Sequence, residues 1–317
     1  MSQNDRSLSV VIPVYQSEPI VDQLVSRLTT VLPGVAGQYE IILVDDGSPD
    51  GSWKEIVAAG KKYPLIVGIR LSRNFGQHNA LLAGIRRARF ATVVTIDDDL
   101  QNPPEEIGKV LAKLEEGYDV VYGTPEEHQY NLWRGMATWV TKFTMAQVVG
   151  KKPGIYDVSA FRAFKTDLRE AFANYSGPFV SIDVLLTWGT KNFGAQPVRQ
   201  DKRAAGRSNY TFLKLVSHSM NLMTGFGVRP LQFASLVGFA FTLFGIGTFA
   251  YVLIRYLLQG SAVQGFAFLA SIIAIFAGAQ LFAIGIMGEY LGRIHFRLMG
   301  QPPYVVGDLA SSFDQVR

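Results

Sequence analysis

Short apolar runs alternate with amphipathic segments along the first 120 residues of the chain. Five runs rich in Val, Ile and Leu have the length of buried strands, at residues 8–15, 39–48, 65–72, 91–99 and 118–123. The intervening segments predict helices, one that ends near residue 32 and others at about residues 53–62, 77–88 and 104–116. Continuous apolar strands separated by helices are typical of an α/β fold whose parallel sheet is covered on both faces.

Two later segments lack charged side chains altogether. No Asp, Glu, Lys or Arg occurs at residues 231–254 or at residues 260–288. A helix of about 20 apolar residues crosses the ~30 Å hydrocarbon layer of a bilayer, so each run is long enough to span one. We expect a membrane region at residues 229–292, with two transmembrane helices at about 231–257 and 265–289. A pair of buried core helices is the alternative.

Charges beside these segments predict their orientation. Arg229 precedes the first segment, Arg293 and Arg297 follow the second, and the short link between them is uncharged. The positive-inside rule then places both ends on the cytoplasmic side of a multi-pass protein of the plasma membrane. The N-terminus has no apolar signal segment, so residues 1–210 are expected to form a cytoplasmic domain and residues 293–317 a cytoplasmic tail.

Composition adds two constraints. The 317 residues include no Cys, which excludes disulfides and thiolate metal sites. The net charge is +4, and residues 191–214 carry six Lys or Arg against one Asp. This basic segment is either an anchor beside anionic lipid or a binding site for a phosphate at the bilayer surface. Nucleic acid is a poor match because no basic and aromatic module appears.

Residues 211–228 lie between the basic segment and the first membrane segment. Their apolar side chains recur at roughly helical spacing, with polar side chains elsewhere on the helical wheel. This pattern predicts an amphipathic helix that lies on the membrane surface. Packing of the same helix against the preceding domain is the alternative.

Three aspartates follow the strand predicted at residues 91–99. Asp97 and Asp99 alternate along an extended chain, so their side chains are expected on the same side, with Asp98 pointing away and tolerant of replacement. Gln101 continues the alternation. Carboxylate and amide oxygens in this pattern suit Mg²⁺ or Mn²⁺. An ordinary Asp-rich turn is the alternative.

Two further polar clusters follow predicted strands. Asp45 and Asp46 can accept hydrogen bonds from a base N–H or from ribose hydroxyls, although a tight turn explains them equally well. Gly76 comes just before a helix and is expected to leave backbone N–H groups open toward an anion, with Arg73 available for a diphosphate. Parallel strands present their carboxyl ends at one edge, so all three clusters are expected there.

Several stretches together carry a resemblance to a known family: VVIPVYQSE, VDDGSPDGS, LSRNFGQHNALLAG, DDDLQNPPEEI and GAQLFAIGIMGEYLGRI. They resemble the inverting nucleotide-sugar glycosyltransferases of the A-type, Rossmann-like fold. The most similar subset is the bacterial polyprenyl-phosphate transferases, which include undecaprenyl-phosphate glucosyltransferases and undecaprenyl-phosphate 4-deoxy-4-formamido-L-arabinose transferases. The dolichol-phosphate mannose synthases are more distant.

The resemblance implies a membrane-bound enzyme that moves one sugar from a UDP-sugar to undecaprenyl phosphate with inversion, using Mg²⁺ or Mn²⁺. The lipid-linked monosaccharide would serve modification of the cell envelope. Glucose is the favoured sugar; formamido-arabinose, an N-acetylated sugar and GDP-mannose are alternatives. The resemblance also implies a homo-oligomer, possibly a tetramer. A processive polysaccharide synthase fits less well because its Gln-x-x-Arg-Trp motif is absent, and a non-enzymatic membrane scaffold is the last alternative.

The resemblance also implies roles for individual residues. Those expected to bind the donor are Pro13, Tyr15, Asp45, Asp46, Arg73, Asp97 and Asp98. Those expected to bind the metal are Asp97, Asp99 and Gln101. Those expected to bind the acceptor phosphate, from DVSAFRAF and RAAGRSNY, are Arg162, Arg203 and Ser208. Those expected to be catalytic are Asp99, Asp157, Arg162 and Arg203. The loop after Gly123 departs from the family pattern because Glu126 and Glu127 occupy a usually basic stretch, so either Arg134 substitutes or the donor differs.

Overall fold

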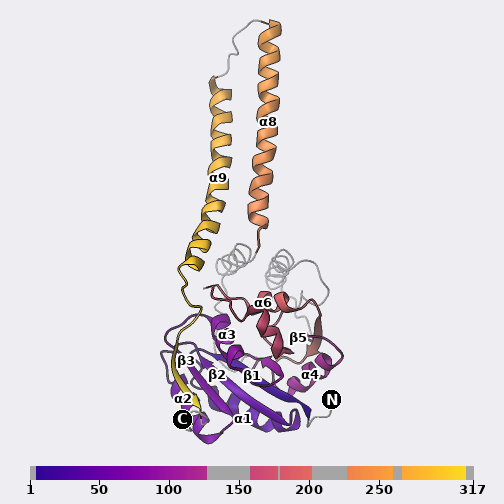
Figure 1. Ribbon diagram of the computed structural model, residues 1–317, viewed down its shortest axis with the longest axis vertical. Helices are drawn as coiled ribbons and strands as arrows, with labels where there is room; N and C mark the ends of the chain where they lie inside the picture. The colour runs from indigo at the N-terminus through magenta and orange to yellow at the C-terminus, as the bar shows by residue number, and fades with distance from the viewer. Residues whose placement is uncertain (1–4, 127–157, 178, 202–226, 260–265, 312–317) are drawn as a thin grey trace.

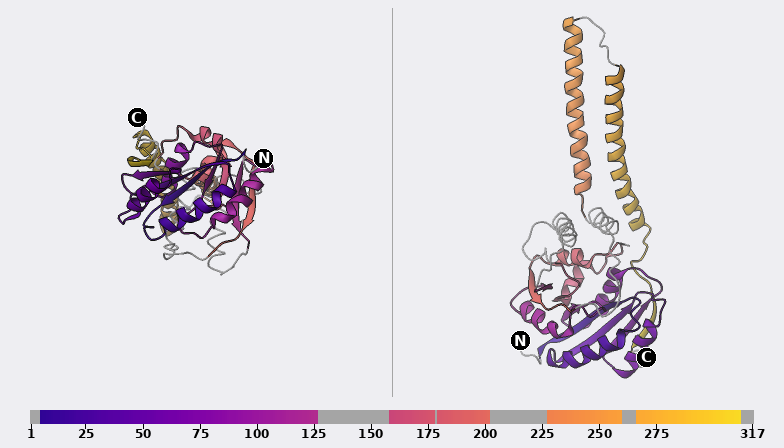
Figure 2. Two further views of the ribbon diagram at one scale, coloured as in Figure 1. Left: turned by 90° about the horizontal axis from the view of Figure 1, so that it is seen from below. Right: turned by 180° about the vertical axis from the view of Figure 1, so that it is seen from behind.

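The computed structural model describes residues 5–126, 158–177, 179–201, 227–259 and 266–311. A mixed β-sheet with helices on both faces lies at one end of the molecule, and two long helices extend away from it (Figure 1). Figure 2 shows the same two parts from below and from behind. The α/β class predicted from the alternation of strands and helices is therefore confirmed.

In the described part of the chain, eight strands form the sheet, in the order β7-β5-β6-β4-β1-β2-β3-β8. Strands β1 to β4 run parallel, as the sequence predicted, but β6 runs antiparallel to β4 and β5, and β8 runs antiparallel to β3. The strands are β1 (Ser7–Val14), β2 (Gln38–Asp45), β3 (Ile66–Leu71), β4 (Thr92–Thr95), β5 (Val120–Pro125), β6 (Arg162–Lys165), β7 (Phe193–Val198) and β8 (Val306–Ser311).

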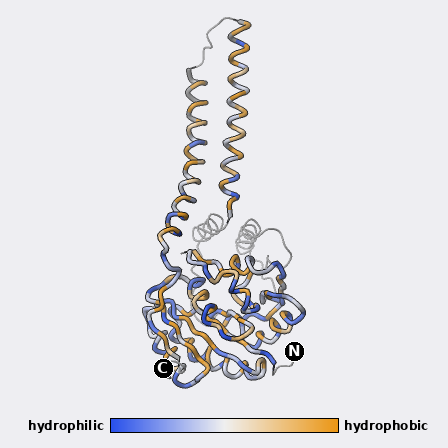
Figure 3. The backbone as a smooth tube through the Cα atoms, viewed as in Figure 1, coloured by the Kyte–Doolittle hydropathy of each residue, from blue (hydrophilic) through white to orange (hydrophobic). Residues whose placement is uncertain are grey.

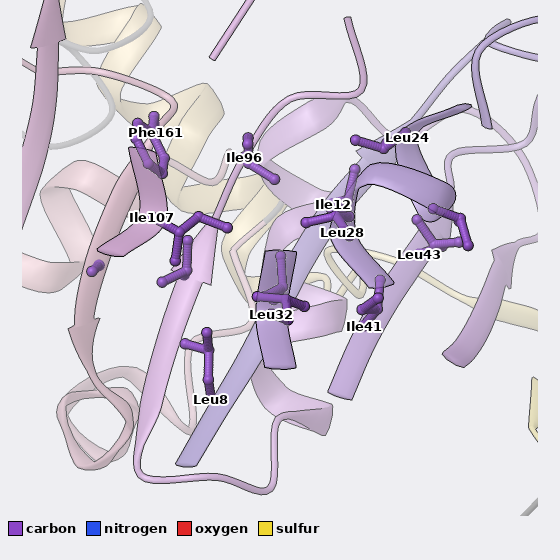
Figure 4. Close-up of a cluster of buried hydrophobic side chains, with 14 of the residues drawn as sticks. Leu8, Ile12, Leu24, Leu28, Leu32, Ile41, Leu43, Ile96, Ile107 and Phe161 are labelled. Carbon is purple, nitrogen blue, oxygen red and sulfur yellow. The ribbon is translucent and has the colours of Figure 1, made fainter. Parts of the chain in front are cut away.

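Alternating side chains divide the core between the two faces of the sheet. On β2, Ile41 and Leu43 pack with helices α1, α2 and α4, whereas Ile42 and Val44 pack with α3 and α6. Figure 4 shows the first of these clusters. The helices and short 3₁₀ turns of the domain are α1 (Val21–Val31), η2 (Leu32–Gly34), α2 (Ser52–Lys62), α3 (Gln77–Arg87), η3 (Pro104–Glu106), α4 (Ile107–Glu115), η5 (Thr166–Phe172) and α6 (Ile182–Gly189).

The two long helices are α8 (Arg229–Gln259) and α9 (Phe266–Leu298). Each contains a candidate membrane span, at Arg229–Arg255 and Ile275–Leu298, with mean hydropathy 2.0 and 1.3. Most of their length is apolar, as Figure 3 shows, and their side chains are largely exposed. The helices contact one another, for example through the rings of Phe241 and Phe276, whose centroids are 5.3 Å apart. The amphipathic helix predicted at residues 211–228 lies almost wholly outside the described residues.

The last strand shows a role in the sheet for part of the segment 293–317, which was predicted as a tail. Helix α9 continues to Leu298, and β8 then pairs with β3 at the edge of the sheet. An edge strand presents unpaired N–H and C=O groups, and β8 satisfies those of β3. The pairing was not predicted because it joins segments far apart in the sequence.

Helix α3 approaches β1 so closely that one position requires glycine. A Cβ at Gly84 would lie 2.4 Å from Val11 Cγ1 and 3.1 Å from Val44 Cγ2. Valine side chains in a packed core cannot move aside easily because their χ1 angle is restricted. The close approach therefore fixes the distance between α3 and the sheet.

We expect Gly84→Ala to lower the free energy of unfolding by about 1–3 kcal/mol, the usual effect of overpacking a core. Gly108→Ala in α4 is the matched control, because the nearest atom to its new Cβ is Val35 Cγ2 at 4.0 Å. That variant should be neutral or more stable by up to ~1 kcal/mol, since Ala favours a helix over Gly. Denaturant unfolding of the detergent-solubilised protein measures both. Equal effects would contradict the tight packing of α3.

Candidate active site

The carboxyl ends of four neighbouring strands bring the predicted polar clusters to one edge of the sheet. The register pairs Val14 of β1 with Asp45 of β2, and Asp45 with Arg70 of β3. Strand β4 lies on the other side of β1, where Val11 pairs with Thr95. Residues that follow these strands therefore lie near one another. Among the predicted donor ligands, Pro13 is buried within β1 and Tyr15, just beyond it, is 44% exposed.

The structure gives Asp98 partners that argue against the expectation that it tolerates replacement. Its Oδ2 accepts hydrogen bonds from the Tyr15 backbone N–H at 3.2 Å and from the Ser17 hydroxyl. The side chain thus joins the segment after β4 to the segment after β1. Burial raises the pKa of Asp98 in spite of these two bonds, which favour the ionised form.

The extended geometry assumed for Asp97, Asp99 and Gln101 is also wrong. Strand β4 ends at Thr95, and the chain turns with Leu100 in the left-handed region at φ 58°. Within this turn the Gln101 backbone N–H donates to Asp99 Oδ1 at 3.0 Å. Asp97 Oδ1 accepts a hydrogen bond from the side-chain amide of Gln77 at 2.7 Å. A turn rather than strand alternation therefore determines how these side chains point.

A divalent ion fits this turn only as a partner of a bound substrate. Within the described ranges, no group of three or more His, Cys, Asp or Glu side chains could hold a metal. Asp97 and Asp99 are half-buried carboxylates at the edge of the sheet. Mg²⁺ commonly binds one or two carboxylates and takes its other ligands from substrate phosphates and water. The two carboxylates fit that mode of metal binding. They do not fit a metal site whose ligands all come from the protein.

Asp46 makes internal contacts that the sequence did not reveal. Its carboxylate accepts hydrogen bonds from the backbone N–H groups of Phe75 at 2.7 Å and Gly76 at 2.8 Å. The N–H group of Gly76 that was expected to face an anion is therefore bound to a carboxylate of the protein itself. Burial raises the pKa of Asp46, and these two bonds oppose the shift. Asp46 thus fixes the β3–α3 loop against the end of β2.

Asp45 is fully buried at the end of β2. Its Oδ1 accepts the Ser48 backbone N–H at 3.1 Å. Among the described residues its Oδ2 accepts no hydrogen bond, and Arg70 Nε lies 3.4 Å away as an ion-pair partner. Burial raises the pKa of Asp45, while Ser48 and Arg70 lower it. The unmet hydrogen-bonding capacity of Oδ2 is a feature that a ligand N–H or hydroxyl would satisfy.

The two glycine-containing turns at this edge pack against each other. Gly47 has φ +65°, and a Cβ there would lie 2.4 Å from the carbonyl carbon of Arg73. The sequence analysis did not single out Gly47, although Asp-Gly is a recognisable turn signal. Arg73 itself is exposed, with its guanidinium 4.4 Å from the ring of Phe75. Arg73, which was predicted to bind the diphosphate of the sugar donor, therefore lies at the surface of this loop.

On the other side of the edge, Arg162 is buried rather than exposed for a phosphate. Its side chain is 2% exposed and forms an ion pair with Asp183 of α6. The Tyr122 hydroxyl donates to Asp183 Oδ1 at 3.0 Å. Burial raises the pKa of Tyr122 well above its ordinary value, so this hydroxyl stays protonated and donates. The sequence analysis missed Asp183 and Tyr122; an acidic residue inside the apolar run SIDVLL was the available signal.

The remaining predicted acceptor residues are Asp157, Arg203 and Ser208, and all three lie outside the described residues. The same holds for Glu127 and Arg134 in the acidic loop. Glu126 is described, and its carboxylate lies 3.6 Å from the Lys109 ammonium. Of the predicted acceptor residues, the structure therefore describes Arg162 alone.

Comparison with known proteins gives a family and a relative that matches over most of the chain. The family described as "Glycosyl transferase family 2" matches residues 9–172. Undecaprenyl-phosphate 4-deoxy-4-formamido-L-arabinose transferase of Shewanella sediminis (strain HAW-EB3) is 35% identical over 313 residues, which cover 97% of this chain and 94% of that protein.

Solved structures match part of the chain at low sequence identity. Glucosyl-3-phosphoglycerate synthase from Mycobacterium tuberculosis, in complex with Mn²⁺, UDP and glucosyl-3-phosphoglycerate, is 19% identical with a TM-score of 0.49, covering 69% of this chain and 78% of that chain. S. aureus TarS is 14% identical with a TM-score of 0.45, covering 73% of this chain and 79% of that chain.

We expect Asp98→Ala to cost about 1–3 kcal/mol of stability, because it leaves the Tyr15 N–H without its acceptor and removes one of the two acceptors of the Ser17 hydroxyl. Asp97→Ala is the comparison, since Asp97 accepts a hydrogen bond from the exposed side chain of Gln77. Denaturant unfolding should show a clearly smaller loss for that variant. Equal losses would contradict a structural role for Asp98.

Asp45→Asn should raise the thermal stability of the protein at neutral pH. A buried Asp whose pKa is raised binds its proton more tightly in the folded state, so its ionisation above that pKa costs stability. Asn stays neutral, and a gain of ~1 kcal/mol would raise Tm by about 2–4 °C in a domain of this size. The gain should shrink as the pH falls toward 3.8, the ordinary value. This reasoning would be contradicted if the difference in Tm between Asp45→Asn and wild type were smaller at pH 7.5 than at pH 5.

Proposed function

The chain belongs to glycosyl transferase family 2, and from this premise we propose that it transfers one sugar from a UDP-sugar to undecaprenyl phosphate or another polyprenyl phosphate. The observation that carries the proposal is the extent of the similarity to a relative named for that acceptor. It covers 97% of the chain and so includes both candidate membrane spans, not the sheet domain alone. A scaffold or a processive synthase has no comparable support.

The donor sugar is the least constrained part of the proposal. The sequence analysis favoured glucose, whereas the named relative acts with 4-deoxy-4-formamido-L-arabinose. We therefore place formamido-arabinose first and glucose second. Discrimination between sugars depends on the shape of a pocket and on its hydrogen-bonding groups.

The position of the spans supports reaction at the membrane surface. Helix α9 leads into β8, and Val306 at the start of β8 pairs with Leu71 at the end of β3. The carboxyl edge of the sheet is therefore the edge toward the spans (Figure 1). A phosphate at the bilayer surface would meet the sugar donor there. We infer from Arg229, Arg293 and Arg297 that this surface is cytoplasmic.

In the proposed reaction an oxygen of the lipid phosphate attacks C1 of the donor sugar, the bond from C1 to the diphosphate breaks, and UDP leaves with inversion at C1. A phosphate monoester has a second pKa of about 6, so the attacking oxygen is already anionic and positioning matters more than a strong base. A divalent ion held by Asp97 and Asp99 would neutralise charge on the departing diphosphate.

The chain's own residues would mainly orient the two substrates. Asp98 holds the segment of Tyr15, and Asp46 holds the β3–α3 loop that carries Arg73 toward the diphosphate. We propose that Asp157, Arg203 and Ser208 serve the acceptor phosphate. Arg162 would act indirectly: its buried pair with Asp183 joins β6 to α6 beside β4. A homo-oligomer, possibly a tetramer, remains part of the proposal.

The decisive experiment is a donor panel with purified full-length protein, undecaprenyl phosphate and Mg²⁺ or Mn²⁺. The donors are the UDP derivatives of formamido-arabinose, glucose and N-acetylglucosamine, together with GDP-mannose. We expect one lipid-linked monosaccharide of inverted anomeric configuration, made from a UDP-sugar and lost on chelation of the metal. The Asp99→Ala variant should lose transfer while remaining folded. Transfer from GDP-mannose alone would contradict the donor class.

A further inference from the structure

Three charged side chains form a ladder across neighbouring strands at the donor side of the edge. Asp45 of β2 pairs in register with Arg70 of β3, and Arg70 pairs with Asp308 of β8. Directly opposite residues on neighbouring strands place their side chains on one face of the sheet. Arg70 accordingly reaches both carboxylates, with Nε 3.4 Å from Asp45 Oδ2 and Nη1 3.8 Å from Asp308 Oδ2.

The three side chains differ greatly in exposure. Asp45 is fully buried, whereas the side chains of Arg70 and Asp308 are 38% and 61% exposed. The guanidinium carbon of Arg70 also lies 6.0 Å from the ring centre of Trp53 in α2. Arg70 is therefore held between a ring, a buried carboxylate and a surface carboxylate. Its position sets the charge environment of the one carboxylate oxygen of Asp45 that accepts no hydrogen bond among the described residues.

A second contact joins the residue just before β8 to the loop that follows β3. The Ser72 backbone N–H donates to the Val305 carbonyl at 2.9 Å. The other end of the same loop is held by Asp46, which accepts the N–H groups of Phe75 and Gly76. Val305, just before β8, thus holds the start of this loop, and Asp46, just after β2, holds its end. Arg73 lies between the two attachments.

We propose that β8 is a positioning element of the donor site, which acts on Asp45 through the Asp308–Arg70 pair and on the β3–α3 loop through Val305. Nucleotide binding by this chain would then depend on a segment that follows both membrane spans. This inference rests on the proposed function, because it assigns Asp45 and the loop to donor binding. The competing explanation is that β8 only covers the open edge of β3, in which case the charge of Asp308 is irrelevant to the donor.

The test compares UDP affinity in full-length variants by titration calorimetry. Asp308→Asn keeps the shape of the side chain and removes its charge. We expect it to raise the Kd for UDP about two- to fivefold, the range that an exposed ion pair supports. Arg70→Gln should raise the Kd further. The double variant should resemble Arg70→Gln alone, since Asp308 acts only through Arg70.

A matched control separates this effect from a general loss of stability. Glu115→Gln removes the charge of a partly exposed carboxylate that forms an ion pair with Arg6 at 2.8 Å. Arg6 precedes the first residue of β1, so this pair lies at the opposite end of the sheet from the donor edge. The variant should leave the Kd for UDP at the wild-type value. Hydrogen exchange of the Ser48 and Ser72 amides, which bond to Asp45 and Val305, should accelerate in Asp308→Asn and not in Glu115→Gln.

The outcomes for the two proposals are distinguishable. If wild-type protein binds UDP and Asp308→Asn binds it equally well, the role of β8 in positioning is overturned while the proposed function stands. If wild-type protein binds no UDP, the proposed function fails, and the role of β8 in the donor site fails with it. If wild-type protein binds UDP, unchanged exchange at Ser48 and Ser72 in Asp308→Asn would overturn the role of β8, and faster exchange together with the raised Kd would support it.

Discussion

Buried carboxylates hold the loops at the carboxyl edge of this sheet in place. Asp46 accepts two backbone N–H groups from the β3–α3 loop, and Asp98 accepts one from Tyr15 and a hydroxyl from Ser17. A hydrogen bond to a charged acceptor contributes about 1.5–3 kcal/mol, against which the desolvation of the carboxylate must be set. The raised pKa values of Asp46 and Asp98 reflect that opposing cost. These bonds hold the Tyr15 segment and the β3–α3 loop at this edge.

This arrangement gives neighbouring aspartates different roles. Asp46 and Asp98 each join a loop to a neighbouring segment through backbone N–H groups. Asp97 and Asp99 accept hydrogen bonds closer by, from the Gln77 side chain and the Gln101 backbone N–H. Polar groups at a functional site commonly need such support, since a loosely held ligand-binding group loses its geometry.

Local pattern was enough to predict the strands β1 to β5, the helices between them and the edge where the polar clusters meet. It failed where the answer depended on a turn or on a distant partner. The left-handed turn at Leu100 overrides strand alternation, and nothing in DDDLQ announces it. From the sequence, Arg162 was predicted to bind the acceptor phosphate. The fold instead places Asp183, from another element, beside it as an ion-pair partner. Strand β8 is short and lies after two apolar helices, so its pairing with β3 has no local signal.

The position of β8 in the chain has a consequence for biosynthesis. Translation delivers β1 to β7 first, then α8 and α9, and β8 last. While the ribosome is still making the spans, β3 is an open edge whose N–H and C=O groups can pair with another chain. The sheet is completed only after the second apolar helix has left the ribosome and residues 306–311 have emerged. A nascent chain of this kind therefore completes its sheet only after both long apolar helices have been made. Stalled or prematurely terminated products would carry an exposed strand that chaperones and proteases can recognise.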